Sequence, residues 1–306
     1  MRSMRQIALL APILGWLGGC ASFSPSDSSG DADALPESLT VVISQLKLHM
    51  RDDTYRFDRA VGADGGNVYA VALWKLDRLA ALRARPEGEW QNADYLVEFA
   101  RGTALERLRR YDEAVSAYQR VEASGSVLGD AAAERLQIAR RFALAATPPQ
   151  QPFASQIEEL QFASERIDVW RGLALEYRDV PQESLAREET EAWEVMRVDG
   201  FARSGQLSEA IRACRALVES NRESKLFGKH LLRLGDLYAD SARREQLKAR
   251  TNIARFDAAK YDGLVDQAFS AYELAGEAHQ PAMRREARTR IDSLQSYHEE
   301  VRAHAP

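Results

Sequence analysis

The sequence predicts an all-α body built from antiparallel helix pairs, and three observations carry this prediction. Apolar residues recur at spacings of three and four from about Glu37 to the end of the chain, which is the period of an amphipathic helix. No stretch alternates apolar and polar residues between turn residues, as a half-buried strand would. Short breaks separate the helical stretches, and short connections favour antiparallel neighbours.

Glycine or proline interrupts the helical period at seven of the breaks, as expected of residues that end helices. These breaks are Gly62 to Gly66, Pro86 with Gly88, Gly125, Pro148 with Pro149, Pro181, Gly205 and Pro281. The predicted helices are Glu37 to Met50, Val68 to Arg85, Ala93 to Leu108, Tyr111 to Ala123, Leu128 to Ala145, Ser155 to Tyr177, Glu183 to Arg203, Leu207 to Glu219, Glu223 to about Ile253, Tyr261 to Ala275 and Ala282 to Arg302.

The first residues have the pattern of a secretory signal peptide. Arg2 and Arg5 precede an apolar run from Ile7 to Leu17, which is too short to span a bilayer as a helix. Two small glycines then lead directly to Cys20. We therefore expect residues 1–19 to be removed on export.

Leu17, Gly18, Gly19 and Cys20 resemble the lipobox of bacterial lipoproteins. This resemblance implies that the Cys20 thiol receives diacylglycerol, carrying fatty acids such as palmitate, and anchors the chain to a membrane. Ala21 after the cysteine, in place of Asp, implies the outer membrane, with the body in the periplasm. Two alternatives stay open: an ordinary signal peptide with an accidental cysteine, and a membrane-embedded N-terminal helix.

Residues 20–36 are rich in Ser, Asp, Gly, Ala and Pro, and this composition predicts a flexible linker spanning roughly 20 to 25 Å. Loss of residues 1–19 removes two arginines and no acids, which takes the formal net charge from −5 to −7. An acidic body argues against nucleic-acid binding and against a polybasic membrane patch. With Cys20 lipidated, Cys214 is left without a disulfide partner.

Three of the predicted helices share one spacing: a large residue, Ala three later, a medium or aromatic residue four after that, and an apolar residue three later still. Such offsets place all four side chains on one helix face, where the small Ala lets a paired helix approach closely. The sets are Tyr111, Ala114, Tyr118, Val121; Leu207, Ala210, Cys214, Leu217; and Val265, Ala268, Tyr272, Ala275.

This spacing resembles the tetratricopeptide (TPR) repeat, a helix-turn-helix unit of 34 residues with small and aromatic residues at set places. Gly102, twelve residues before Ala114, matches the small residue of the first helix, and Gly205 fits the inter-helix turn. The resemblance implies a right-handed α-solenoid. The repeat-packing residues that it assigns are Gly102, Tyr111, Ala114, Tyr118, Gly205, Leu207, Ala210, Cys214, Gly235, Ala268 and Tyr272.

The chain departs from the family pattern in three places. Val198 stands where the second copy needs a small residue, and Pro148 falls one period after Ala114. In the third copy, Gly235 precedes Ala268 by 33 residues instead of 12. We therefore predict a degenerate array, with a non-repetitive helical bundle as the alternative.

The predicted domain order after the linker has three parts. Residues 37–92 form an N-terminal helical cap or a separate small domain, residues 93–278 the TPR-like repeats, and residues 279–306 a capping helix, because stacked repeats need ends with a polar outer face.

The sequence contains no recognisable catalytic or metal-binding motif. The five histidines are dispersed without an HExxH pair, and neither a P-loop nor a GxSxG elbow occurs. The acid pairs Glu158 with Glu159 and Glu188 with Glu189 are interpreted as solvated helix faces, and the tryptophans mostly as core. We expect no cofactor, metal, nucleic acid or small-molecule ligand.

The resemblance implies a membrane-anchored periplasmic scaffold that binds envelope protein partners rather than an enzyme. Stacked helix pairs offer a long concave surface to a peptide or a partner domain. The alternatives are a cell-wall-acting enzyme or enzyme regulator, and a purely structural envelope spacer.

Overall fold

A computed structural model describes residues 34–62, 65–82, 94–251, 256–278 and 280–303. Cys20 and the predicted signal peptide lie outside these residues. In the described part of the chain the regular secondary structure is α-helix, and its only β-type pairing is an isolated bridge between Val61 and Asn67. The predicted all-α class is therefore confirmed. None of the described helices combines the length and apolarity needed to cross a membrane.

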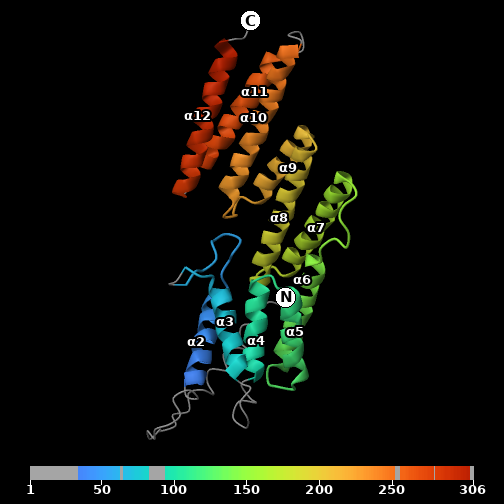
Figure 1. Cartoon of the computed structure of the whole chain (residues 1–306), viewed down its shortest axis with the longest axis vertical. Coiled ribbons are helices and arrows are strands. Elements are labelled where there is room, and N and C mark those ends of the chain that lie inside the picture. Colours follow the sequence, from blue (N-terminus) through green and yellow to red (C-terminus); the bar gives the residue numbers. More distant parts are fainter. Residues whose placement is uncertain (1–33, 63–64, 83–93, 252–255, 279, 304–306) are drawn as a thin grey trace. The chain divides into compact units, whose positions relative to one another are not determined.

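The observed helices match the predicted ones to within a few residues at each end (Figure 1). Pro181 and Pro281 lie at the predicted breaks as the first residues of the helices that follow, because the first helical position needs no N–H and suits the fixed φ of proline. The bounds are α2 Ala34–His49, α3 Val68–Leu82, α4 Asp94–Arg107, α5 Tyr111–Ala123, α6 Gly129–Ala146, α7 Gln156–Glu176, α8 Pro181–Arg203, α9 Leu207–Ser220, α10 Phe227–Thr251, α11 Ala258–Gly276 and α12 Pro281–Ala303.

Helix α2 begins three residues before its predicted start, so residues 34–36 of the predicted linker belong to its first turn. Pro36 is tolerated there because the first turn of a helix leaves its N–H groups unpaired.

The chain divides into two compact units. Unit 1 contains residues up to Asp53, Arg59–Pro149 and Glu176–Leu185, and unit 2 contains Thr54–Asp58, Gln150–Leu175 and Ala186–Pro306. The domain boundaries drawn from the sequence stay a prediction.

In unit 1, α2 to α6 pack as successive neighbours along the chain (Figure 1). Their apolar faces meet in a core that includes Leu76, Ala104, Tyr118 and Leu136, each at most 1% exposed. Asn67 accepts the backbone N–H of Tyr69 at 2.9 Å and so caps α3.

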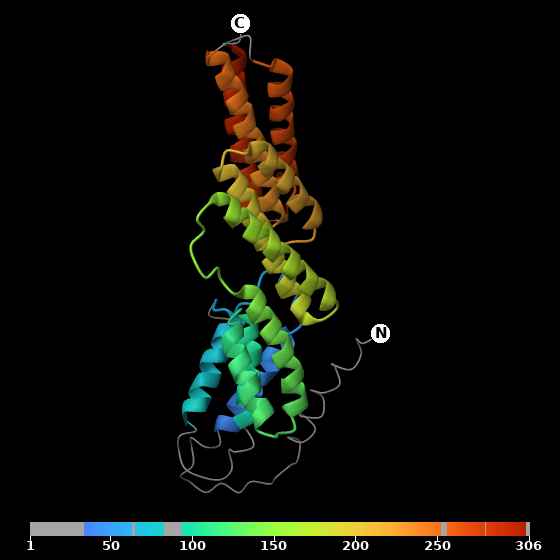
Figure 2. The same ribbon diagram turned by 90° about the vertical axis from the view of Figure 1, so that its right-hand side faces the viewer.

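In unit 2, α9 packs against α10, α10 against α11, and α11 against α12; Figure 2 shows α10, α11 and α12 as long neighbouring columns. Their core includes Leu217, Tyr261, Val265 and Ala287, each at most 1% exposed. From α2 to α6 in unit 1 and from α9 to α12 in unit 2, successive helices thus pack as neighbours, as in an α-solenoid.

Candidate protein-binding surface

The α4–α5 and α8–α9 turns have the same backbone geometry. Arg109 and Gly205, each five residues before the Ala of its copy, both have positive φ, at 63° and 76°. The next residue in each turn donates its N–H five residues back, from Arg110 to Leu105 at 2.9 Å and from Gln206 to Phe201 at 3.0 Å. The predicted inter-helix turn therefore recurs, with glycine in one copy and arginine in the other.

Two glycines of the predicted packing set lie against tyrosine rings. A Cβ atom added to Gly102 would be 2.6 Å from the Tyr118 ring, and one added to Gly235 would be 2.3 Å from the Tyr272 ring. In both pairs the absent side chain makes room for the tyrosine of the second helix. The rest of the set is buried except for Leu207, which is half-buried at the edge of its core, and Gly205, which is exposed in its turn.

The second copy replaces the glycine and tyrosine with a larger and a smaller residue. Val198 and Cys214 are both at most 1% exposed and belong to one apolar cluster. Burial raises the pKa of the Cys214 thiol to about 12, so the thiol stays neutral and packs as a small apolar group. The larger side chain of Val198 on α8 is thus compensated by the smaller side chain of Cys214 on α9.

The 33-residue spacing in the third copy arises from two elongated helices. Helix α10 continues to Thr251, well beyond Gly235, and α11 begins at Ala258, ten residues before Ala268. The turn therefore moves outward, while the contact between Gly235 and Tyr272 is kept.

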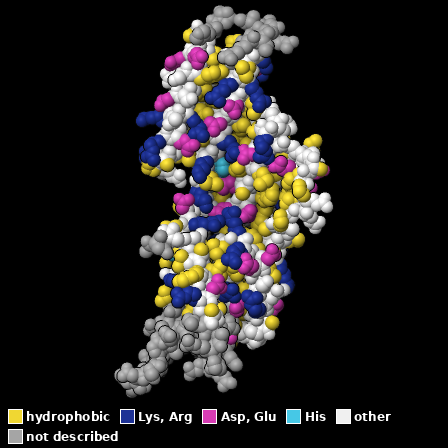
Figure 3. All heavy atoms as spheres, in the orientation of Figure 1, with side chains coloured by type: hydrophobic (Ala, Val, Ile, Leu, Met, Phe, Trp, Pro, Cys, Tyr) yellow, Lys and Arg dark blue, Asp and Glu magenta, His cyan; other side chains and the backbone are white. Residues whose placement is uncertain are grey.

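An open hollow of about 450 Å³ lies between α10 and α12 in unit 2. Leu232 and Leu237 form its apolar part. Its other lining residues are charged, three of each sign: Lys229, Arg233, Asp236, Asp240, Glu286 and Arg290. Figure 3 shows basic and acidic side chains interspersed on the face of the molecule in view, rather than separated by sign.

Asp236 joins three helices at this hollow. Its Oδ1 accepts the Tyr272 hydroxyl of α11 at 2.8 Å and the Arg290 Nε of α12 at 2.9 Å. Arg290 also donates to Glu286 at 2.8 Å. Burial and the hydrogen bond to Asp236 raise the pKa of Tyr272, so its hydroxyl remains a donor. These bonds hold the side chains of the hollow in position before any partner binds.

The composition of this hollow suits a protein surface better than a small molecule. Small-molecule sites are lined mostly by apolar and aromatic side chains, whereas six of the eight lining residues here are charged. The hollow runs along α10 and is called the α10–α12 groove below. Lys229 is exposed at its start and Asp240 is exposed near its other end along α10. Opposite charges at two positions along one helix can set the direction in which a peptide binds.

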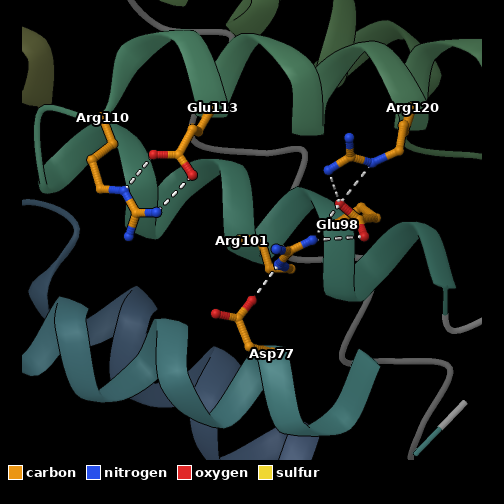
Figure 4. Close-up of polar contacts among 6 residues, drawn as sticks. All are labelled: Asp77, Glu98, Arg101, Arg110, Glu113 and Arg120. Carbon is orange, nitrogen blue, oxygen red and sulfur yellow. Dashed lines mark hydrogen bonds and ion pairs between the residues drawn. The ribbon is translucent and has the colours of Figure 1, made fainter. Parts of the chain in front are cut away.

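A second array of charges links α3, α4 and α5 in unit 1, and Figure 4 shows its members. Arg101 donates to Asp77 at 2.8 Å and to Glu98 at 3.1 Å, and Arg120 reaches Glu98 at 2.8 Å. Glu98 is 9% exposed, so two guanidinium groups neutralise a nearly buried carboxylate. The array ties three helices together.

The remaining Figure 4 pair lies at the surface. Arg110 donates two 2.6 Å hydrogen bonds to Glu113, which lower the pKa of that carboxyl, and both side chains are about half exposed.

The interpretation of Glu188 as part of a solvated face is wrong. Glu188, Glu191 and Glu194 lie three residues apart on α8 and are 6%, 2% and 5% exposed. Their partners Lys225, His230 and Asn221 are 27 to 39 residues away in the chain, so local spacing gave no signal for them. Glu189, one position on, is half-buried, as the 100° step around a helix requires.

The aromatic residues divide between core and surface. Trp170 is fully buried, as predicted, whereas Trp74 is 56% exposed on α3 with the Arg78 guanidinium 5.0 Å from its ring centroid. In the described residues, no cluster of His, Cys, Asp or Glu has the arrangement of a metal site. Trp90 lies outside the described residues.

Comparisons with known proteins complete this description. No protein-family model matches the chain. No curated protein matches it either. Among solved structures, the chain is similar to a TPR repeats protein from Bacteroides fragilis NCTC 9343, with 15% identity and a TM-score of 0.35 over 90% of this chain and 100% of that chain. We therefore infer function from the residues of this chain itself.

Proposed function

We propose that this protein is a membrane-anchored periplasmic scaffold that binds an envelope protein through the groove between α10 and α12. The observation that carries the proposal is the groove itself: charges of both signs, among them Asp236, Glu286 and Arg290 held by hydrogen bonds, surround two leucines. Leu232 and Leu237 are 3% and 6% exposed and form the floor of the groove, so its charged side chains are the groups that a partner would contact first. The signal-peptide pattern and the lipobox-like residues before Cys20 support the anchor.

The anchor is tested by comparing the wild type with Cys20→Ser. We expect the wild type to have the mass of an acylated chain and to fractionate with the outer membrane, and the variant to lose both properties. A wild-type chain that is unacylated and recovered in a soluble fraction would exclude the anchor and leave the groove to be tested separately.

The groove is tested by placing a photo-crosslinking amino acid at Lys229 or Asp240 in the full chain. The control position is Glu273, which is exposed on α11 and does not line the groove. We expect one crosslinked partner from the two groove positions, absent from the control and lost when Asp240→Lys is introduced with the crosslinker at Lys229. Equal crosslinking from all three positions would exclude the groove as the specific surface.

A further inference from the structure

A short segment outside the helices is held by specific contacts within unit 2. The segment is Thr54–Asp58, whose flanking residues on both sides, up to Asp53 and from Arg59, belong to unit 1. Thr54 and Tyr55 are each 1% exposed, whereas Phe57 is 67% exposed. The chain therefore buries two consecutive residues of this segment and leaves a large apolar neighbour in solvent.

Lys225 binds the main chain of the segment. Its backbone N–H donates to the Tyr55 carbonyl at 3.1 Å, and its ammonium donates to the Thr54 carbonyl. The same ammonium pairs with the buried Glu188 of α8 at 2.6 Å, which fixes its position. These bonds recognise peptide groups, so they do not depend on the side chains of the bound segment.

The side chains of the segment are recognised by separate contacts. The Tyr55 hydroxyl donates to the Asn221 side-chain oxygen at 2.9 Å, and the Arg187 guanidinium lies 4.0 Å from the centre of the Tyr55 ring. Burial raises the pKa of Tyr55 to about 12, which keeps this hydroxyl a donor. Arg56 pairs with the exposed Glu223 at 2.6 Å. Two consecutive side chains of the segment, the Tyr55 phenol and the Arg56 guanidinium, are thus each bound by unit 2.

The residues that form this site are held by bonds that do not involve the segment. Asn221 donates to Glu194 at 2.7 Å, Glu194 also accepts from Arg171 at 3.0 Å, and His230 contacts Glu191 at 2.6 Å. These contacts join α7, α8 and the start of α10. The side chains of the site are therefore ordered before a peptide binds. This pre-organisation reduces the entropy that the site loses on binding.

We propose that this part of unit 2 is a peptide-recognition site which Thr54–Asp58 fills in cis, and that its partner is a protein segment carrying a tyrosine followed directly by a basic residue. The partner segment binds by replacing the cis segment. Main-chain hydrogen bonds supply affinity, while the Tyr55 pocket and Glu223 supply specificity, as in other modes of peptide recognition. This site shares no residue with the lining of the α10–α12 groove, so the two proposals can fail independently.

The test uses the full chain and a fluorescent peptide with the sequence of residues 51–60. Tyr55→Ala with Arg56→Ala empties the site, whereas Phe57→Ala changes an exposed side chain of the same segment and is the matched control. In the wild type, the cis segment competes at an effective concentration on the order of millimolar, so we expect the peptide to bind the emptied variant at least about tenfold more tightly. Phe57→Ala should behave as the wild type does.

Specificity is measured with the same emptied variant. A peptide in which alanine replaces the residue corresponding to Tyr55, and a chain that also carries Glu223→Lys, should each lose most of the binding. Two results would overturn the proposal: no peptide binding to an emptied variant that is folded by circular dichroism, or equal affinity for that variant and the wild type.

A second measurement avoids the buried residues, in case the emptied variant does not fold. Glu223→Arg replaces the exposed partner of Arg56, which also contacts Arg187 at 3.5 Å, and we expect trypsin to cleave after Arg56 several-fold faster than in the wild type. The double variant Arg56→Asp with Glu223→Arg restores an ion pair between positions 56 and 223 with the charges exchanged. Because the double variant has no arginine at position 56, its cleavage is followed after Arg59. Protection at Arg59 should be lost in the single variant and regained in the double variant; unchanged cleavage at Arg59 in the single variant contradicts the proposal.

Discussion

Gly235 of α10 lies directly against the ring of Tyr272 of α11, and a Cβ atom at that glycine would be 2.3 Å from the ring carbon Cε1. The ring cannot move aside without loss, because Tyr272 is 3% exposed and its hydroxyl donates to Asp236 at 2.8 Å. The glycine is therefore required by the packing of the two helices rather than by a turn.

We expect Gly235→Ala to lower the free energy of unfolding by about 1 to 3 kcal/mol through overpacking. Gly263→Ala on α11 is the control, since a Cβ there meets no atom within 4 Å. Alanine is the better helix former, so the control should be neutral or more stable by up to about 1 kcal/mol. Urea unfolding followed by circular dichroism compares the two; equal midpoints would show that the tyrosine ring adapts to the added methyl group.

The small alanines of the three copies offer a second test of the helix packing. Ala114, Ala210 and Ala268 are all fully buried, and replacing any of them with leucine should destabilise the fold by roughly 1 to 3 kcal/mol. Ala216→Leu, at an exposed position of α9, is the control. If thermal unfolding is unchanged in all three buried variants, these alanines do not pack as the repeat requires.

The charge array of unit 1 predicts unequal effects for two glutamates. Glu98→Gln leaves Arg101 and Arg120 facing a neutral amide at a 9% exposed position, and we expect a loss of about 1 to 3 kcal/mol. Glu113→Gln removes a solvent-exposed pair with Arg110 and should cost less than about 1 kcal/mol. Unfolding midpoints in low and high salt check this difference, and an effect of Glu113→Gln as large as that of Glu98→Gln would refute it.

Burial of Cys214 predicts an unreactive thiol. In a Cys20→Ser chain this is the sole thiol, and its pKa of about 12 leaves almost no thiolate at pH 8. We expect negligible reaction with a thiol reagent in the native protein and one equivalent after denaturation. Rapid native labelling would mean that α9 and α10 open readily.

Stability should fall at alkaline pH because of the buried tyrosines. Burial raises the pKa of Tyr55 and of Tyr261 from 10.0 to about 12. Above pH 10 these tyrosines ionise more readily in the unfolded chain, which favours unfolding. The stability that they contribute is complete below pH 10 and is lost as the pH rises toward 12. Absorbance of tyrosinate should show some of the ten tyrosines ionising only together with unfolding; complete, reversible ionisation near pH 10 in the folded state would disprove this.

The periodicity of apolar residues was sufficient to locate every described helix, because a helix must place its apolar side chains on one face whatever it packs against. The alanine spacing also identified residues that are buried in the structure, including Ala114, Ala210 and Ala268. Proline was harder to interpret: Pro181 and Pro281 begin helices because their missing N–H is not needed there, so the same residue marks either a break or a start.

Tertiary structure decided which charged side chains are buried. Glu188, Glu191 and Glu194 have the spacing of one helix face, and only their partners Lys225, His230 and Asn221 show that this face points inward. Tyr55 finds its acceptor Asn221 166 residues away. Local sequence determines helices through short-range hydrogen bonds and apolar periodicity, whereas pairing between distant polar groups depends on how the helices pack, and that packing places Tyr55 in its site.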